Sequence, residues 1–186
     1  QDRVRLRRAV GDVLARLGWP EMLEAEPQDA VTVVFTELGA ANATATVLDD
    51  VIVNALGLEP RPGLAALLPP FASWGHPGRL EAGTAHAMGL CTACIANATD
   101  LVVVCRDDAA LRRVIVPIAA VEITPVRGID PDAGLHVVHV EHPPHDSAEL
   151  ENGVWDATVA AGRCAVAHQL AGACRTMLAL AREHAV

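Results

Sequence analysis

The sequence contains no lysine and no tyrosine, and all 14 of its basic residues are arginine. They stand against 23 acidic residues, which leaves a formal net charge of −9. A nucleic-acid partner needs a basic surface to meet its phosphates. This deficit of positive charge therefore argues against nucleic acid as a partner.

Long apolar runs are also missing, since polar residues interrupt every stretch of about eighteen residues. No membrane-spanning segment and no signal peptide are therefore predicted. The cysteines are odd in number, which does not suggest the disulfide framework of a secreted protein. They are Cys91, Cys94, Cys105, Cys164 and Cys174. We expect a cytoplasmic protein without a membrane partner.

What the chain has in quantity is apolar side chains: 52% of its 186 residues are hydrophobic, enough to build a sizeable core and to exclude disorder. It starts at Gln1 rather than Met and stops at Val186, inside a predicted helix with no capping residue behind it. We expect the sequence to be less than the whole gene product.

The first part of the chain, residues 1–78, is predicted to be a helical domain followed by a linker. Apolar residues recur every three or four positions from Val4 to Leu17, and Gly18 ends that helix. Further helices are predicted over 29–39 and 41–56. Five prolines between residues 60 and 77 then predict a linker over 58–78.

The second part, residues 79–148, is predicted to be a β domain. Short runs rich in β-branched residues alternate with turn signals, which is typical of an antiparallel meander or a small barrel. The predicted strands cover 99–105, 111–117, 120–126 and 134–141, with a further strand possible over 79–88.

The third part, residues 149–186, is predicted to contain one long helix from about residue 153. Its many Ala and Gly residues would let another helix approach closely, so we expect it to pack in a bundle. The stripe predicted to be buried comprises Val159, Val166, Leu170, Cys174, Met177, Leu178 and Ala181. The predicted fold class is therefore α+β: helices, an antiparallel β domain, then a long helix.

Three groups of polar residues invite a chemical interpretation. Cys91 and Cys94 form a CxxC pair, but no second pair completes a zinc site, so two core thiols are the simpler interpretation. His136, His139, His142 and His145 recur every third residue, which places neighbours on opposite faces of a strand and speaks against a metal site. Glu37 and the pair Asp49–Asp50 are interpreted as helix surface.

Three segments taken together resemble the acyl-CoA dehydrogenase family. The first is Leu17–Pro20 with Val34–Gly39, and the third is Ala160–Ala167 running on to Ala181–Val186. The second consists of the motifs Gly83–Thr84, Ala98–Val104, Ile115–Pro117 and Val121–Pro125. The resemblance implies early helices, a central β domain and the first helix of a C-terminal bundle. It also implies an FAD enzyme that removes a proton and a hydride from an acyl-CoA thioester.

The sequence departs from that pattern at four places. The Thr-Glu-Pro-like segment is not found where the linker 58–78 stands, and Met88–Cys94 has no aromatic residue where a Trp-Ile-Thr-like strand would cover the flavin. Gly162 occupies a position where some relatives carry the catalytic Glu. The chain also ends before the Arg-x-x-Phe-Gly motif that helps to bind FAD across a subunit interface.

The resemblance therefore leaves two readings, a truncated copy or a degenerate subunit similar to those of heteromeric acyl-CoA dehydrogenases of bacterial steroid side-chain breakdown. It implies a homo- or hetero-oligomer with another such subunit, and it places Arg163 near the acyl-CoA. Alternatively, Arg163 covers the bundle with its stem and meets a carboxylate. Two competing classes are a non-enzymatic assembly partner with the same fold and no flavin, and a metal or redox protein.

Overall fold

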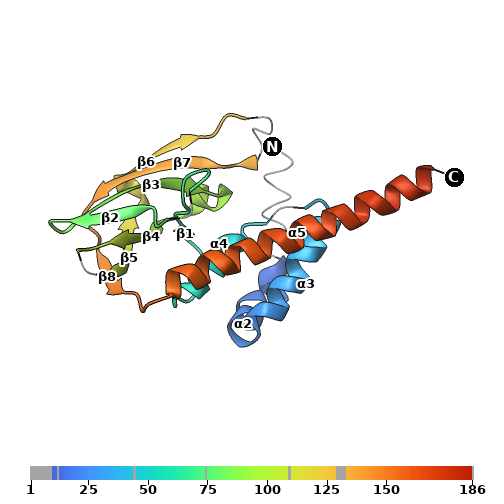
Figure 1. Ribbon diagram of the computed structural model, residues 1–186, viewed down its shortest axis with the longest axis horizontal. Helices are drawn as coiled ribbons and strands as arrows, with labels where there is room; N and C mark the ends of the chain where they lie inside the picture. The colour runs from blue at the N-terminus through green and yellow to red at the C-terminus, as the bar shows by residue number, and fades with distance from the viewer. Residues whose placement is uncertain are drawn as a thin grey trace.

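The computed structural model describes residues 10–185 except 12, 44, 74, 109 and 129–132. N-terminal helices and a central sheet lie side by side, and a long C-terminal helix, α5 (Val154–His184), runs across the helices and projects beyond them (Figure 1). The predicted α+β fold class and its order of helices, β region and long helix are confirmed. The domain boundaries at residues 78 and 148 stay a prediction.

The early helices are α2 (Trp19–Ala25), α3 (Pro27–Ala40) and α4 (Val47–Ala55). Prolines at the first turns of α2 and α3 suit those positions, because a first-turn N–H has no intrahelical partner. The helix predicted over 41–56 is wrong at its start, since α4 begins only at Val47. Asn42 adopts a positive φ of 48°, a left-handed conformation that an α-helix does not continue through.

The sheet has eight strands in the order β6-β7-β3-β2-β4-β5-β8, with β1 pairing β4. The strands are β1 (Leu64–Ala66), β2 (Gly78–Glu81), β3 (Thr84–Cys91), β4 (Asp100–Arg106), β5 (Leu111–Pro117), β6 (Val121–Pro125), β7 (His136–His142) and β8 (Asp146–Glu149). Short 3₁₀ helices, η1 (Ala93–Asn97) and η2 (Ile118–Ala120), lie before β4 and β6.

Three details of the predicted β domain are corrected. The sheet is mixed rather than antiparallel, because β1 and β2 both run parallel to β4. The predicted linker contains β1, which uses the proline-free residues between Pro62 and Pro69. The single strand expected over 79–88 is a hairpin of β2 and β3 that turns at Ala82 and Gly83, both at positive φ.

Strand β4 lies inside the sheet, between β2 and β5, and both of its faces are buried. Leu101, Val103 and Cys105 enter a core enclosed by the curled sheet. Val102 and Val104 face the opposite way, into a second core that contains Ile52 of α4 and Trp155 of α5. Burial on both faces explains why this strand is a continuous apolar run rather than an alternating one. A third core joins α2, α3, α4 and α5.

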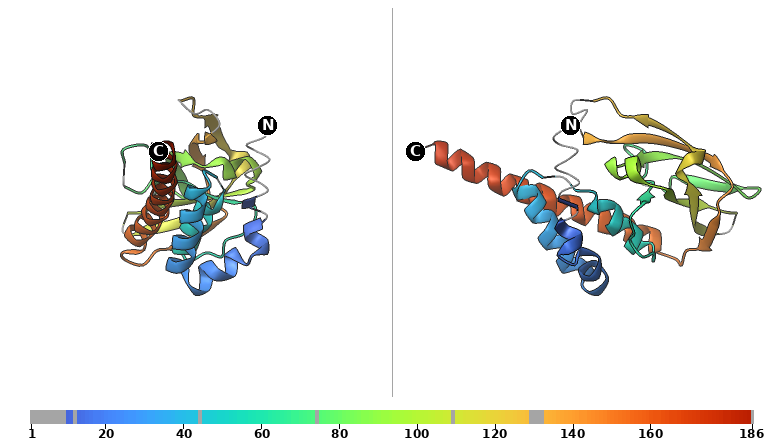
Figure 2. Two further views of the ribbon diagram at one scale, coloured as in Figure 1. Left: turned by 90° about the vertical axis from the view of Figure 1, so that its right-hand side faces the viewer. Right: turned by 180° about the vertical axis from the view of Figure 1, so that it is seen from behind.

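Helix α5 crosses α3 at a point where two glycines meet the opposite backbone. A Cβ atom at Gly172 would lie 2.0 Å from the Thr36 carbonyl oxygen, and one at Gly39 would lie 1.9 Å from that of Gln169. The close approach predicted from the small residues of this helix is therefore present. Beyond this crossing α5 extends past the other helices, as the view from behind also shows (Figure 2).

The stripe predicted to be buried on α5 is wrong except at Val159, which is half-buried against the core shared by α4 and β4. Val166 is 42% exposed, Leu170 61% and Met177 68%. The buried residues of this helix are Trp155, Thr158, Ala165 and Gly172. Small side chains were selected over large ones because only they admit the α3 backbone at this distance. Among the described residues, no helix is both long and apolar enough to cross a bilayer.

Candidate functional site

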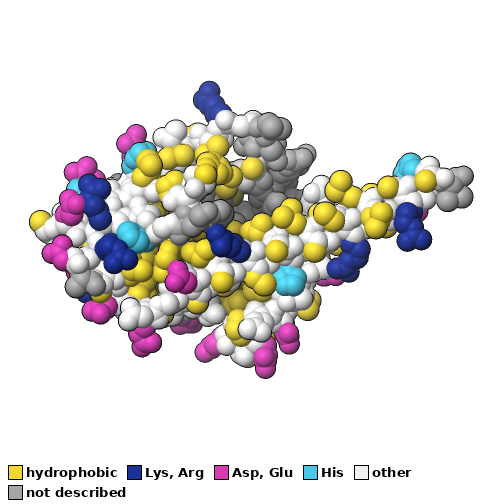
Figure 3. Space-filling view, in the orientation of Figure 1, with side chains coloured by type: hydrophobic (Ala, Val, Ile, Leu, Met, Phe, Trp, Pro, Cys, Tyr) yellow, Lys and Arg dark blue, Asp and Glu magenta, His cyan; other side chains and the backbone are white. Residues whose placement is uncertain are grey.

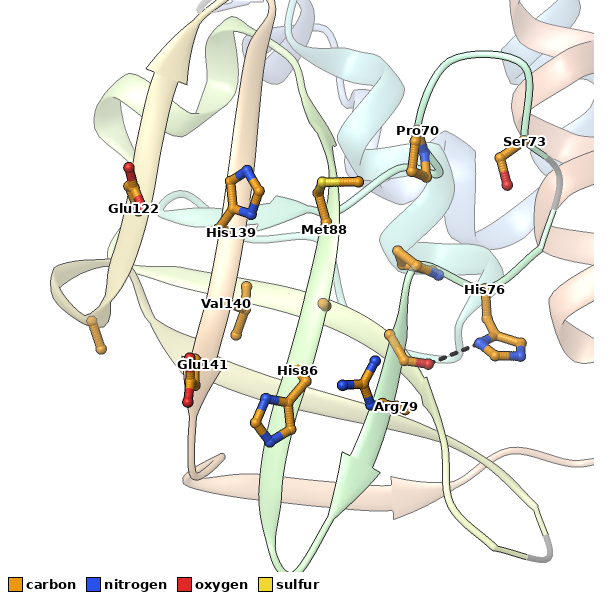
Figure 4. A pocket seen from close by; sticks show the side chains of 14 residues that line it. Pro70, Ser73, His76, Arg79, His86, Met88, Glu122, His139, Val140 and Glu141 are labelled. Atoms are coloured by element: carbon orange, nitrogen blue, oxygen red, sulfur yellow. Dashed lines mark hydrogen bonds between the residues drawn. The ribbon is translucent and has the colours of Figure 1, made fainter.

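A cavity of about 730 Å³ lies over the outer face of β2, β3, β7 and β6 (Figure 4). The loop between β1 and β2 closes one side of it with Pro70, Ser73 and His76. Strand residues supply most of the rest of its lining, among them Arg79, His86, Met88, Glu122, His139 and Glu141. Its volume falls in the range of small-molecule and cofactor sites, roughly 300–1,000 Å³.

Strand register arranges the polar side chains of this cavity in two rows. His86 of β3 pairs with Arg79 on one side and Glu141 on the other. His139 of β7 pairs with Met88 on one side and Glu122 on the other. Because residues two apart share a face, these side chains project together from the sheet, away from the core that holds Val138 and Val140 (Figure 4).

Two polar side chains of the cavity, Arg79 and His76, are held by neighbours. The Nε of Arg79 forms a salt bridge with Glu81 at 2.5 Å, and both side chains are exposed. His76 Nδ1 donates to the Gly78 carbonyl at 2.8 Å, while its Nε2 accepts from Arg106 Nε at 3.2 Å. These partners fix the neutral tautomer of His76 with its proton on Nδ1.

The residues singled out on α5 lie elsewhere. Arg163 is exposed and is not among the described residues that line the cavity. At Gly162 a Cβ atom would lie 2.8 Å from Ile52 Cδ1, so a side chain here would displace the tip of a buried isoleucine. This contact gives a packing reason for glycine at the position where some acyl-CoA dehydrogenases carry the base. The substrate-binding role of Arg163 stays a prediction.

The CxxC pair consists of two thiols directed at β1. Cys91 Sγ donates to the Ala66 carbonyl at 3.4 Å, and Cys94 Sγ donates to that of Leu64 at 3.9 Å. Burial raises the pKa of both thiols, that of Cys94 to about 12, and the nearby Asp49 raises them further. All five cysteines are free. A thiol with a raised pKa is a poor nucleophile, so this pair has the character of core thiols.

The four histidines that recur every third residue are separated by the fold. His139 faces the cavity, whereas His136 and His142 hydrogen-bond nearby carbonyls through Nδ1. His145 lies 3.7 Å from Asp100, outside β7. Within the described ranges, no group of three His, Cys, Asp or Glu side chains is arranged to hold a metal ion.

The interpretation of Asp49 as helix surface is wrong. Asp49 is 1% exposed, its Oδ1 accepts from the Ala66 amide at 3.0 Å, and its Oδ2 accepts from the Thr92 hydroxyl at 2.5 Å. Asp50 is half-buried, and it accepts from Trp19 Nε1 at 2.9 Å. A signal was present in the sequence: Asp49 shares the helical spacing of Ile52, Val53 and Leu56, all of which are buried.

The sequence matches no family model and no curated protein.

Solved structures match the fold along most of the chain. The ChsE4–ChsE5 complex from Mycobacterium tuberculosis gives a TM-score of 0.66 at 15% identity, covering 96% of this chain and 57% of that one. The steroid acyl-CoA dehydrogenase Tcur3481–Tcur3483 gives 0.61 at 16% identity, covering 96% and 59%. XiaF from Streptomyces sp., solved with FADH2 and glycerol, gives 0.55 at 14% identity, covering 95% and 55%.

The chain thus has the fold of the acyl-CoA dehydrogenases and of related flavin enzymes, and the resemblance in the sequence is confirmed at that level. It spans little more than half the length of each of these three structures. Two of the three are assemblies of two different proteins.

The fold implies FAD, whose diphosphate calls for positive charge and backbone donors and whose ring calls for an apolar or aromatic wall. The cavity offers one arginine, already paired with Glu81, and two carboxylates, Glu122 and Glu141, that oppose a diphosphate. No aromatic side chain lines it within the described part of the chain. These residues by themselves do not fit FAD.

Proposed function

We propose that this chain is the non-catalytic subunit of an FAD-dependent acyl-CoA dehydrogenase, a complex that introduces an α,β double bond into an acyl-CoA thioester. The observation that carries the proposal is the likeness of almost the whole chain to two heteromeric proteins, one of which is a steroid acyl-CoA dehydrogenase. A coenzyme A thioester of a steroid side chain is the substrate that this likeness favours.

The proposal assigns the base to a partner subunit. Proton abstraction next to a thioester needs a carboxylate held against the α carbon in a site from which water is excluded. Gly162 supplies no such group. The carboxylates of the cavity, Glu122 and Glu141, are both exposed. Neither has the dry setting that this step requires.

Binding of FAD is likewise assigned to the complex rather than to this chain alone, since the described residues that line the cavity do not fit FAD.

The proposed partner is a second chain of the same fold, and the exposed residues of α5 are its contact surface. Side chains of this helix leave an apolar face open to solvent (Figure 3). Arg163, exposed on the same helix, would hold the acyl-CoA by its charge.

Co-expression tests this proposal. The chain would be produced alone and together with its genomic neighbour, and each preparation would be examined for flavin absorbance. We expect the complex to be yellow and the isolated chain to be colourless. Steroid acyl-CoA should bleach the flavin of the complex, and Arg163→Gln should raise the KM for that substrate without removing the flavin. A complex that stays colourless would refute the enzymatic proposal.

The alternative is an assembly partner that has this fold but supports no flavin in any complex. The absence of an aromatic wall from the described lining and the glycine at position 162 favour it. The same experiment separates the two functions, because the assembly partner forms a stable complex that binds neither flavin nor acyl-CoA.

A further inference from the structure

Asp49 connects two chain segments that are distant in the sequence. Its carboxylate lies between the end of β1, where it accepts from the Ala66 amide, and the residue after β3, where it accepts from the Thr92 hydroxyl. Thr92 in turn accepts from the Cys94 amide and so caps η1. One buried side chain of α4 therefore holds β1, β3 and η1 in place together.

Both segments lead from this carboxylate to the wall of the cavity. Two residues beyond Ala66, Leu68 exchanges two backbone hydrogen bonds with Leu90, which lies two residues before Thr92. Two residues further along, Pro70 and Met88 line the cavity. Leu68 and Leu90 thus form one β-bridge midway between the Asp49 carboxylate and the cavity, and four residues of extended chain in each segment span about 13 Å.

The pairing of these segments is unusually close. A Cβ atom at Gly89 would lie 2.2 Å from the Leu68 carbonyl oxygen and 3.0 Å from Leu67 Cγ. Only glycine allows this approach, so the bridge between Leu68 and Leu90 has little freedom to shift without opening. A change in position at the Asp49 end is therefore transmitted to the other end rather than absorbed between them.

We infer that Asp49 is a positioning residue for the cavity: its two hydrogen bonds set the separation of the segments that carry Pro70 and Met88, and thereby the shape of the wall. The inference concerns the shape of this cavity and does not rest on the proposed function, which places no ligand in it. It assigns no contact between Asp49 and a ligand.

The raised pKa of Asp49 is consistent with a carboxyl group held by hydrogen bonds in a buried site. Burial raises the pKa of Asp49 to about 6, against the opposing effect of the Thr92 and Ala66 hydrogen bonds. The titratable groups that interact with it are Asp50 on the same helix, Cys91 at the end of β3 and Cys94 in η1. Asp50 and the two thiols add no positive charge, so the hydrogen-bond donors are what favour ionisation of Asp49.

Hydrogen–deuterium exchange of the full chain tests the inference without any flavin or substrate. The segments to follow are 64–70 and 86–92, with β5 and β8 as an internal reference. Asp49→Ala removes both hydrogen bonds and should raise exchange in both segments about tenfold or more while leaving the reference unchanged. Asp49→Asn keeps an acceptor for Ala66 and offers a donor to Thr92, so it should restore protection. Asp50→Asn is the matched control and should leave both segments as in the wild type.

A second pair of variants covers the case in which Asp49→Ala fails to fold. Thr92→Val removes the hydroxyl at nearly constant shape and should raise exchange in 86–92, whereas Thr92→Ser retains the hydroxyl and should not. Unchanged exchange in Asp49→Ala and Thr92→Val, or an increase spread evenly over the reference strands, would overturn the inference. A colourless complex would refute the proposed function and leave this exchange result standing, so the two failures can be told apart.

Discussion

The two parts of α5 differ in how they meet the rest of the molecule. From Val154 to Thr176 the helix buries or half-buries a residue every three or four positions, and Thr176 still donates its hydroxyl to the Ala40 carbonyl at 3.0 Å. From Met177 to Ala185 every side chain is exposed. Apolar residues are as frequent after Met177 as before it, so the two parts of the helix differ in whether another element of the chain packs against them.

The comparison shows that side-chain volume, rather than hydrophobicity, decided which face is buried. An apolar stripe of Val166, Leu170, Cys174 and Met177 is exposed, and its centre lies about 145° around the helix from the small-residue face that includes Ala165 and Gly172. Close packing on α3 requires small residues, and the larger ones are left for another surface. Four predictions test this contrast.

The largest effect is expected at the crossing of α5 and α3. Gly172→Val would place a Cβ 2.0 Å from the Thr36 carbonyl oxygen, a backbone clash that no rotamer relieves. Overpacking of this kind should lower the free energy of unfolding by about 4 kcal/mol. Urea denaturation would measure it. Ala171→Val, at the exposed neighbouring position, is the matched control and should cost less than about 1 kcal/mol; equal costs would show that the crossing is not tightly packed.

The next effect concerns α4, which supports the packed part of α5. The folded-state pKa of Asp49, about 6, lies above its ordinary value of 3.8, so the folded chain binds the extra proton between these pH values. The resulting stabilisation is complete below about pH 3.8 and is lost as the pH rises through about 6. It amounts to about 3 kcal/mol at most.

Comparing wild type with Asp49→Asn isolates this contribution, because other carboxyl groups titrate in both proteins. We expect the free energy of unfolding of the wild type, relative to that of the variant, to fall between pH 4 and pH 6. A difference that stays constant or grows over this range would contradict the assignment.

A smaller cost is expected where α5 meets α4. Gly162→Glu restores the residue that some acyl-CoA dehydrogenases carry, but its Cβ would meet Ile52 Cδ1 at 2.8 Å. The end of an isoleucine can give way, so the cost should be about 1–2 kcal/mol. Ile52→Val removes that methyl group, and the double variant should cost less than the sum of the two single changes. Strict additivity would show that the two residues do not compete for space.

The smallest effect on stability is expected on the exposed side. Leu170→Glu with Met177→Glu should change the unfolding free energy of the isolated chain by no more than about 0.5 kcal/mol. The same variant should lose the proposed partner in co-purification. Ala160→Glu with Ala171→Glu, also exposed but outside the apolar stripe, is the matched control and should retain it. Retention of the partner by both variants would place the interface elsewhere.

Local patterns predicted more of the fold than of the candidate site. The strand over 111–117 and the long helix were found because apolar spacing and turn signals are local. Strand β1 was missed because its pairing with β4 is a non-local contact between residues about 36 positions apart. The cavity was missed for the same reason, since the register that aligns Arg79, His86 and Glu141 joins three strands. The burial of Asp49 was within reach of the sequence, because its helical spacing already placed it on the apolar side of α4.

Strands β1 and β2 pair with the same edge of β4, and this arrangement has a consequence for how related chains can vary. β1 occupies one edge of β4 over residues 100–102, and β2 occupies the same edge over residues 105–106. The loop that joins them leaves and re-enters at this edge and brings Pro70, Ser73 and His76 to the cavity. Lengthening or shortening the part of this loop between Pro70 and His76 costs little conformational entropy and leaves the strand hydrogen bonds of Leu67, Leu68 and Pro77 in place. Insertions between residues 70 and 76 could therefore change the shape of the cavity in related chains while the sheet stays the same.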